Sequence, residues 1–95
     1  MEVYKKEAAD LVEQLLTLRK QGRPEDILKR ASRLLEIAQL HQDSYYTAAA
    51  LYFQAYYEFS KGNYKECLQH CFQSEEYCEK NDYLKILAYI HNLQG

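Results

Sequence analysis

The sequence predicts an all-α protein built as a stack of antiparallel helix pairs. Apolar residues recur at helical spacing along almost the whole chain. Helix breakers are scarce, since the 95 residues include one proline and three glycines, and this disfavours a turn-rich β fold. The chain also matches itself when it is shifted by forty residues, which indicates a repeated structural unit.

Two helices, separated by a turn, are expected in a first unit over about residues 3–41. The first helix ends at Gly22, which suits the left-handed residue that follows many helices. Pro24 fits the first turn of the second helix, and Glu25 and Asp26 follow near the positive end of its dipole. The apolar positions of the two helices are Tyr4, Ala8, Leu11, Leu15 and Leu18, then Ile27, Leu28, Ala31, Leu34, Leu35 and Ala38.

A second unit is expected over about residues 43–81 and a partial third over about residues 82–95. Asp43 and Ser44 are candidate N-caps for the first helix of the second unit, because their side-chain oxygens can accept from free backbone N–H groups. Asp82 is the corresponding candidate for the last helix. The helices expected in these units cover about residues 44–61, 64–80 and 83–94.

Equivalent residues support the forty-residue offset. Helix-breaking positions fall on helix-breaking positions, and apolar positions fall on apolar positions. Chance matching between helices of similar composition is the alternative explanation. Two sets of three identical residues recur at this offset, namely Ala8, Ala48 and Ala88, and Gln14, Gln54 and Gln94.

The segment of residues 50–68 resembles the tetratricopeptide repeat. The family pattern has a large apolar residue, a small residue at the helix crossing, a Gly-Asp/Asn-Tyr turn, and Glu-Ala-Leu at the start of the second helix. Cys67 stands where that alanine is usual, and Glu58 and Cys71 replace aromatic residues of the pattern. The matching positions are Leu51, Ala55, Gly62, Asn63, Tyr64, Glu66 and Leu68.

The resemblance covers essentially the whole chain as one domain, residues 1–95, and the forty-residue period resembles a variant common in bacterial sensory and regulatory proteins. It implies a right-handed α-solenoid of about five helices. It also implies that the chain binds a protein or a peptide, as the interaction or input module of a larger cytoplasmic regulatory or signalling protein.

Tyrosines concentrate on the helix expected at residues 44–61. Tyr45, Tyr52 and Tyr56 share one stripe with Ala49, and the resemblance implies that this stripe and Ser60 face a concave groove. Tyrosine suits a binding groove because its ring offers a large contact area and a polar tip. The alternative is that these rings fill the core, as aromatic stripes at helical spacing often do. Weaker candidates for partner contact are Gln54, Glu58 and Lys61.

Three cysteines, Cys67, Cys71 and Cys78, share a face of one expected helix. A structural zinc site needs four ligands, and a disulfide between neighbouring turns of one helix would be strained. The forty-residue offset aligns the cysteines with inward-facing apolar positions, so we expect buried free thiols. A thiol-based redox or metal sensor is therefore the least favoured function, and no metal or other cofactor is expected.

Catalytic motifs are absent from the sequence. It contains no nucleophile elbow, phosphate-binding glycine loop or dinucleotide fingerprint, and His41, His70 and His91 are scattered over three expected helices. We therefore expect a non-enzymatic protein with no catalytic residues.

The charge distribution restricts the kinds of partner. The net charge is −2 with no basic stripe, which disfavours nucleic acid. No apolar run approaches the roughly 20 residues of a membrane span, and the first residues do not resemble a signal peptide. We expect a cytoplasmic protein without membrane contact.

The last expected helix is apolar on two sides. Tyr83, Ile86 and Ile90 lie on one side, whereas a terminal repeat usually needs a polar outer face. The chain could be part of a longer repeat array, or these three residues could pair with a second copy. A homodimerisation module is therefore the alternative function. The other apolar side carries Leu84, Leu87, Ala88 and His91.

Overall fold

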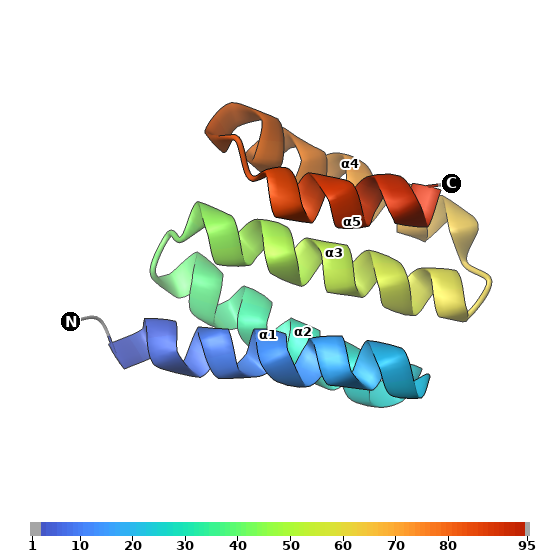
Figure 1. Cartoon of the computed structure of the whole chain (residues 1–95), viewed down its shortest axis with the longest axis horizontal. Coiled ribbons are helices and arrows are strands. Elements are labelled where there is room, and N and C mark those ends of the chain that lie inside the picture. The colour runs from blue at the N-terminus through green and yellow to red at the C-terminus, as the bar shows by residue number, and fades with distance from the viewer. Residues whose placement is uncertain (1–2, 95) are drawn as a thin grey trace.

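The computed structural model describes residues 3–94, and these residues form five helices without a strand. The helices pack against their neighbours in sequence order, and α1, α3 and α5 form one layer in front of α2 and α4 (Figure 1). The predicted all-α stack of helix pairs is confirmed. No helix within the described range is long and apolar enough to cross a membrane. The helices are α1 (Val3–Gln21), α2 (Pro24–Leu40), α3 (Ser44–Ser60), α4 (Tyr64–Asn81) and α5 (Leu84–Gln94).

Residues with a left-handed backbone conformation, at positive φ, follow the ends of several helices. Gly22 and Gly62, with φ of 67° and 79°, close the two helix pairs, and glycine adopts this conformation without a Cβ clash. At the start of α3, Asp43 is the N-cap, and its Oδ1 accepts from the Tyr46 backbone N–H at 3.0 Å. This confirms the predicted cap at Asp43.

Asp82 does not have the role predicted for it. It has a φ of 59° and follows the last residue of α4. In this conformation the backbone N–H of Tyr83 reaches the carbonyl of Cys78 at 3.0 Å and satisfies an acceptor at the end of α4. Aspartate tolerates the left-handed region better than most residues, which explains why it can occupy this place.

Helix α3 lies at the centre of the molecule and packs against each of the other four helices. Small residues allow close approach where helices cross, and Ala8 and Ala48 are both fully buried. At the crossing of α3 and α4, the Ser74 hydroxyl donates to the Ala48 carbonyl at 2.8 Å. The candidate site lies on the side of α3 that faces away from α4, between α1 and α5.

Candidate partner-binding groove

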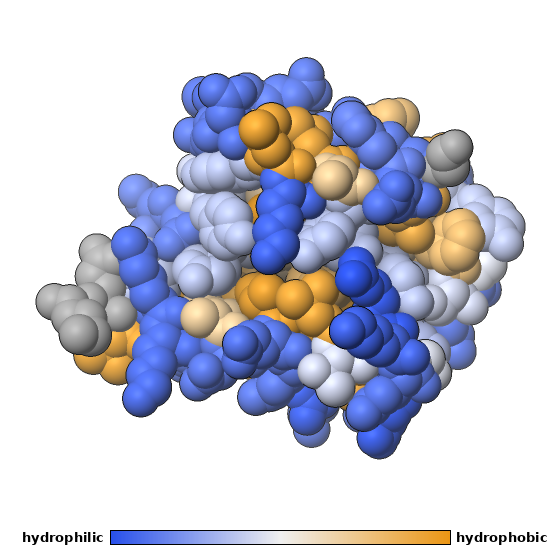
Figure 2. Space-filling view, viewed as in Figure 1, coloured by the Kyte–Doolittle hydropathy of each residue, from blue (hydrophilic) through white to orange (hydrophobic). Residues whose placement is uncertain are grey.

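A groove runs between α1 and α5, with α3 as its floor. Two adjoining hollows form it, and they share Tyr52 and Tyr89; the wider hollow encloses ≈ 530 Å³. Figure 2 shows this face of the molecule, with apolar side chains at the centre and hydrophilic side chains on both sides. We call it the α1–α5 groove, lined by Val12, Leu16, Arg19 and Lys20 of α1, Tyr45, Ala49, Tyr52, Phe53, Tyr56 and Phe59 of α3, and Lys85, Ile86, Tyr89, Asn92 and Leu93 of α5.

Four of the five residues predicted to contact a partner line this groove, but two of them are buried. Tyr52 is only 3% exposed and Ala49 is equally covered, so neither offers much surface to a partner. The reason is that α5 packs across this part of α3, where the rings of Tyr52 and Tyr89 lie 5.4 Å apart. For these two residues, the alternative of core packing is correct.

The other predicted residues remain accessible to different degrees. Tyr56 is half-buried, and its hydroxyl donates to the Arg19 carbonyl at 3.4 Å. Tyr45 is 36% exposed and packs edge-on against the ring of Tyr83. Ser60 is exposed outside the groove lining, and its hydroxyl donates to the Tyr56 carbonyl. Tyr45 and Tyr56 are thus the predicted residues that present aromatic surface to the groove.

Arg19 connects the two walls of the groove. Its Nη1 donates to the Tyr52 hydroxyl at 2.7 Å, and its Cζ lies 4.9 Å from the centroid of the Tyr89 ring. Burial raises the pKa of Tyr52, although the hydrogen bond from Arg19 acts in the opposite direction. The hydroxyl therefore remains protonated at neutral pH, and the guanidinium interacts here with neutral aromatic groups.

The charged side chains that line the groove are all cationic. Arg19, Lys20 and Lys85 line it, and no aspartate or glutamate is among its lining residues. None of the ion pairs found within residues 3–94 includes these three cations. The groove is therefore locally positive, although the chain as a whole has a net charge of −2.

The weaker candidates lie outside the groove. The Lys61 Nζ forms an ion pair with the Glu25 Oε1 at 2.8 Å, which joins the end of α3 to the start of α2. The Glu58 Oε2 accepts from the Asn63 side chain, and Gln54 is half-buried on the same helix. These three residues are not among the groove lining and are not brought together with the tyrosines.

Sequence reasoning missed part of the groove, although the repeat contained a signal for it. A shift of forty residues from Tyr45 and Ala49 gives Lys85 and Tyr89, and a shift from Ser60 gives Lys20. Each of these equivalent residues lines the groove. The offset, applied to Tyr45, Ala49 and Ser60 as well as to Tyr52 and Tyr56, would have identified them.

The residues predicted to pair with a second copy point into the chain instead. Ile86 and Ile90 are 2% and 0% exposed and belong to the core, and Tyr83 is half-buried against Tyr45. The open side of α5 is the other apolar side, where Leu84 is 71% exposed and Ala88 is also accessible.

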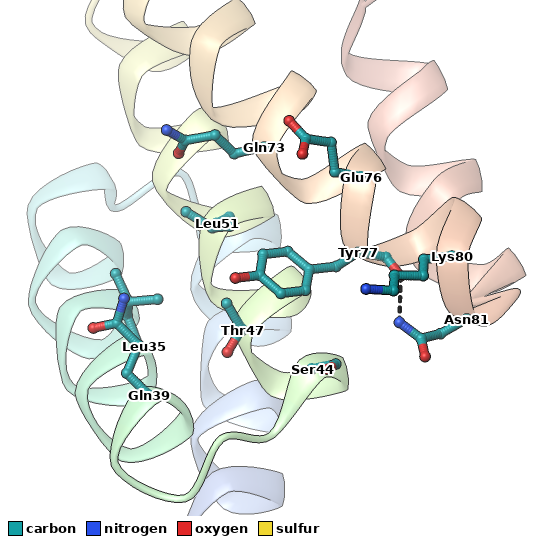
Figure 3. Close-up of a pocket in the computed structure, with 10 residues that line it drawn as sticks. All are labelled: Leu35, Gln39, Ser44, Thr47, Leu51, Gln73, Glu76, Tyr77, Lys80 and Asn81. Atoms are coloured by element: carbon teal, nitrogen blue, oxygen red, sulfur yellow. Dashed lines mark hydrogen bonds between the residues drawn. The ribbon is translucent and has the colours of Figure 1, made fainter.

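A second groove, which we call the α2–α4 groove, lies on the opposite side of the molecule between α2 and α4. It encloses ≈ 570 Å³, and buried Thr47 and Leu51 of α3 form its base (Figure 3). Its walls carry amides and one charge of each sign, Glu76 and Lys80, so the charges of its lining balance. The remaining lining residues are Leu35, Gln39, Ser44, Gln73, Tyr77 and Asn81.

The three cysteines are buried free thiols, as the repeat predicted. They lie on the side of α4 that packs in the core, and burial raises the pKa of the Cys71 thiol to about 12. Such a thiol is almost entirely protonated at neutral pH and therefore reacts slowly. No group of three or more His, Cys, Asp or Glu side chains that could hold a metal ion is found among residues 3–94.

Comparison of the chain with protein-family models, with curated proteins and with solved structures finds no match. The function of the α1–α5 groove is therefore inferred from its own geometry and from the repeat pattern.

Proposed function

We propose that the chain is a non-enzymatic tetratricopeptide-like scaffold that docks a segment of another protein in the α1–α5 groove. The observation that supports this most is the combination of accessible apolar and aromatic surface with unpaired cations in one groove. Such grooves, with a few polar groups over an apolar floor, are typical ligand sites. In keeping with the resemblance, the scaffold would serve as the interaction module of a larger cytoplasmic regulatory or signalling protein.

The rigidity of the groove floor favours this function. Tyr52 and Phe53 are buried, and Arg19 holds the Tyr52 hydroxyl, so the floor is already ordered before a partner arrives. A preformed surface loses less conformational entropy on binding than a flexible one. The half-buried rings of Tyr56 and Tyr89 then supply contact area next to the aliphatic Leu16.

Selection from a random peptide library, followed by NMR mapping, tests the proposed function. We expect selected peptides to shift the resonances of Leu16, Tyr56 and Tyr89. Leu16→Asp should abolish binding, whereas Leu35→Asp should not; Leu35 is an equally half-buried leucine that lines the α2–α4 groove. Circular dichroism would establish that both variants are folded. Peptides that perturb only the α2–α4 groove, or a library that yields none, would contradict the proposal.

A second candidate function, homodimerisation, is supported by the exposed side of α5. Leu84 and Ala88 form an apolar strip there, whereas Ala48, the equivalent of Ala88 on α3, is covered by α4. We expect Leu84→Glu to abolish a dimer, measured by light scattering over a concentration range. Ile86→Glu cannot serve this purpose because Ile86 is buried in the core, so a charge there would disrupt the packing of α5 itself. A monomer at all concentrations would rule out this candidate.

A further inference from the structure

The charge of the α1–α5 groove points to the chemistry of its occupant. Resting on the proposed function, we propose that the bound segment is acidic, with its carboxylates facing Arg19, Lys20 and Lys85. The three cations stand on both walls, since α1 contributes Arg19 and Lys20 and α5 contributes Lys85. A segment that lies along the groove therefore meets positive charge on either side.

Arg19 has donor capacity that the chain does not use. Within residues 3–94 its side-chain hydrogen bond goes to the neutral Tyr52 hydroxyl, and none of the ion pairs there includes it. A guanidinium has five N–H donors arranged to match a carboxylate. Its contact with the Tyr89 ring already holds it at the groove, so a carboxylate there would gain a positioned partner.

The contrast with other surfaces of the molecule strengthens this inference. Arg33 is paired with Glu7 and Glu36, and Lys61 is paired with Glu25. These two cations have carboxylate partners within the chain, although such exposed pairs contribute little to stability. Other exposed lysines, such as Lys29 and Lys65, belong to none of the ion pairs found within residues 3–94. In the groove, by contrast, three cations stand together without an acidic residue among the lining side chains. This asymmetry is what an acidic partner would complement.

An acidic protein segment fits these charges better than a nucleic acid does. Binding along a phosphate backbone needs a positive field over many phosphates. Here only three cations line the groove and the chain as a whole has a net charge of −2, so a polyanion that extended beyond the groove would find no continuous positive field. A short segment with a few carboxylates matches the size of the positive region.

The experiment uses three fluorescent ten-residue peptides with the same apolar residues, in which the polar positions are all aspartate, all asparagine or all lysine. Binding to the chain is measured by fluorescence anisotropy, and the contacted residues are mapped by NMR. We expect only the aspartate peptide to bind well. Its affinity should fall several-fold between about 50 mM and about 300 mM NaCl, because salt screens accessible charges.

Matched charge reversals then locate the effect. Lys20→Glu with Lys85→Glu should weaken the aspartate peptide at least about tenfold, the change that corresponds to about 1.4 kcal/mol in binding. Lys29→Glu with Lys65→Glu changes the net charge equally on exposed sites of α2 and α4, and we expect less than about a twofold effect because neither lysine lines the groove.

The outcomes separate this inference from the proposed function. If the asparagine or lysine peptide binds the groove as tightly as the aspartate peptide, the inference fails while the groove remains a binding site. If none of the peptides, including those selected from the random library, perturbs the groove, both fail. An oligothymidine probe is also tested. If it binds more tightly than the aspartate peptide, and if Lys20→Glu with Lys85→Glu abolishes that binding, the inference is overturned and the occupant is a nucleic acid.

Discussion

Helices α3 and α5 occupy equivalent places in the repeat, forty residues apart, yet their surroundings differ. Helix α3 is packed by four helices and buries eight residues, whereas α5 packs against α3 and α4 and buries only Ile86 and Ile90. Ala48 is 0% exposed, but its equivalent Ala88 is open. The repeat therefore determines which positions are small or apolar, while the presence of a covering helix determines whether they are buried.

The largest expected effect comes from truncating the centre of α3. Phe53→Ala should lower the free energy of unfolding by about 3–5 kcal/mol, because a fully buried ring leaves a cavity. A chain of this size has a total stability of about 5–15 kcal/mol, so this loss brings it near unfolding. Leu93→Ala, at the equivalent and half-buried position of α5, should cost clearly less. Urea denaturation measures both, and equal losses would contradict the comparison.

Enlarging the small residue at the helix crossing tests the comparison directly. Ala48→Leu should destabilise the chain by about 1–3 kcal/mol, because α4 approaches closely enough for Ser74 to hydrogen bond to the Ala48 carbonyl. Ala88→Leu should change stability by no more than about 0.5 kcal/mol, because that position is open. Thermal and urea melts of the two variants would show whether Ala88 is covered in solution.

A smaller effect is expected at the start of α3. Asp43→Ala should lower the free energy of unfolding by about 1 kcal/mol, because the Asp43 carboxylate accepts hydrogen bonds from the Tyr46 N–H and from the Tyr4 hydroxyl. Asn63→Ala is the matched control, since Asn63 is the N-cap of α4 but makes no side-chain capping bond; it should cost less. If both variants lose the same free energy, the Asp43 cap is not formed in solution.

The last prediction concerns alkaline pH and the face of α4 that covers α3. Burial keeps the Cys71 thiol neutral in the folded state, with a pKa of about 12 against an ordinary 9.0. The stability that this thiol contributes is complete below about pH 9 and is lost as the pH rises toward 12. Urea midpoints at pH 8 and at about pH 10.5 should therefore differ less in Cys71→Ala than in the parent chain. An unchanged difference would contradict the buried thiol.

Much of the fold could be predicted because each helix carries its own apolar periodicity and its own end signals. The fourth helix was predicted to end at about residue 80 and ends at Asn81. Asp82 was misassigned because aspartate is favoured both as an N-cap and, among non-glycine residues, in the left-handed region. Its conformation depends on how α4 closes, which local sequence does not determine.

The candidate site was less predictable, because it depends on contacts between helices that are distant in the sequence. The tyrosine stripe lies along the groove on α3, but its own periodicity could not show that α5 would cover Tyr52. Likewise, nothing near Arg19 in the sequence indicates that its guanidinium lies over the ring of Tyr89. Such contacts follow from the relative positions of whole helices rather than from local pattern.

The short length of α5 affects how long the groove stays formed. This helix is the shortest of the five described and buries the fewest residues, so it belongs to the part of the molecule expected to open most readily by local unfolding. Because α5 supplies Lys85 and Tyr89, detachment of this one helix would remove a wall of the groove while the remaining helices stay folded. A bound segment would in turn slow hydrogen exchange of the α5 amides, so that occupancy and the docking of α5 are linked.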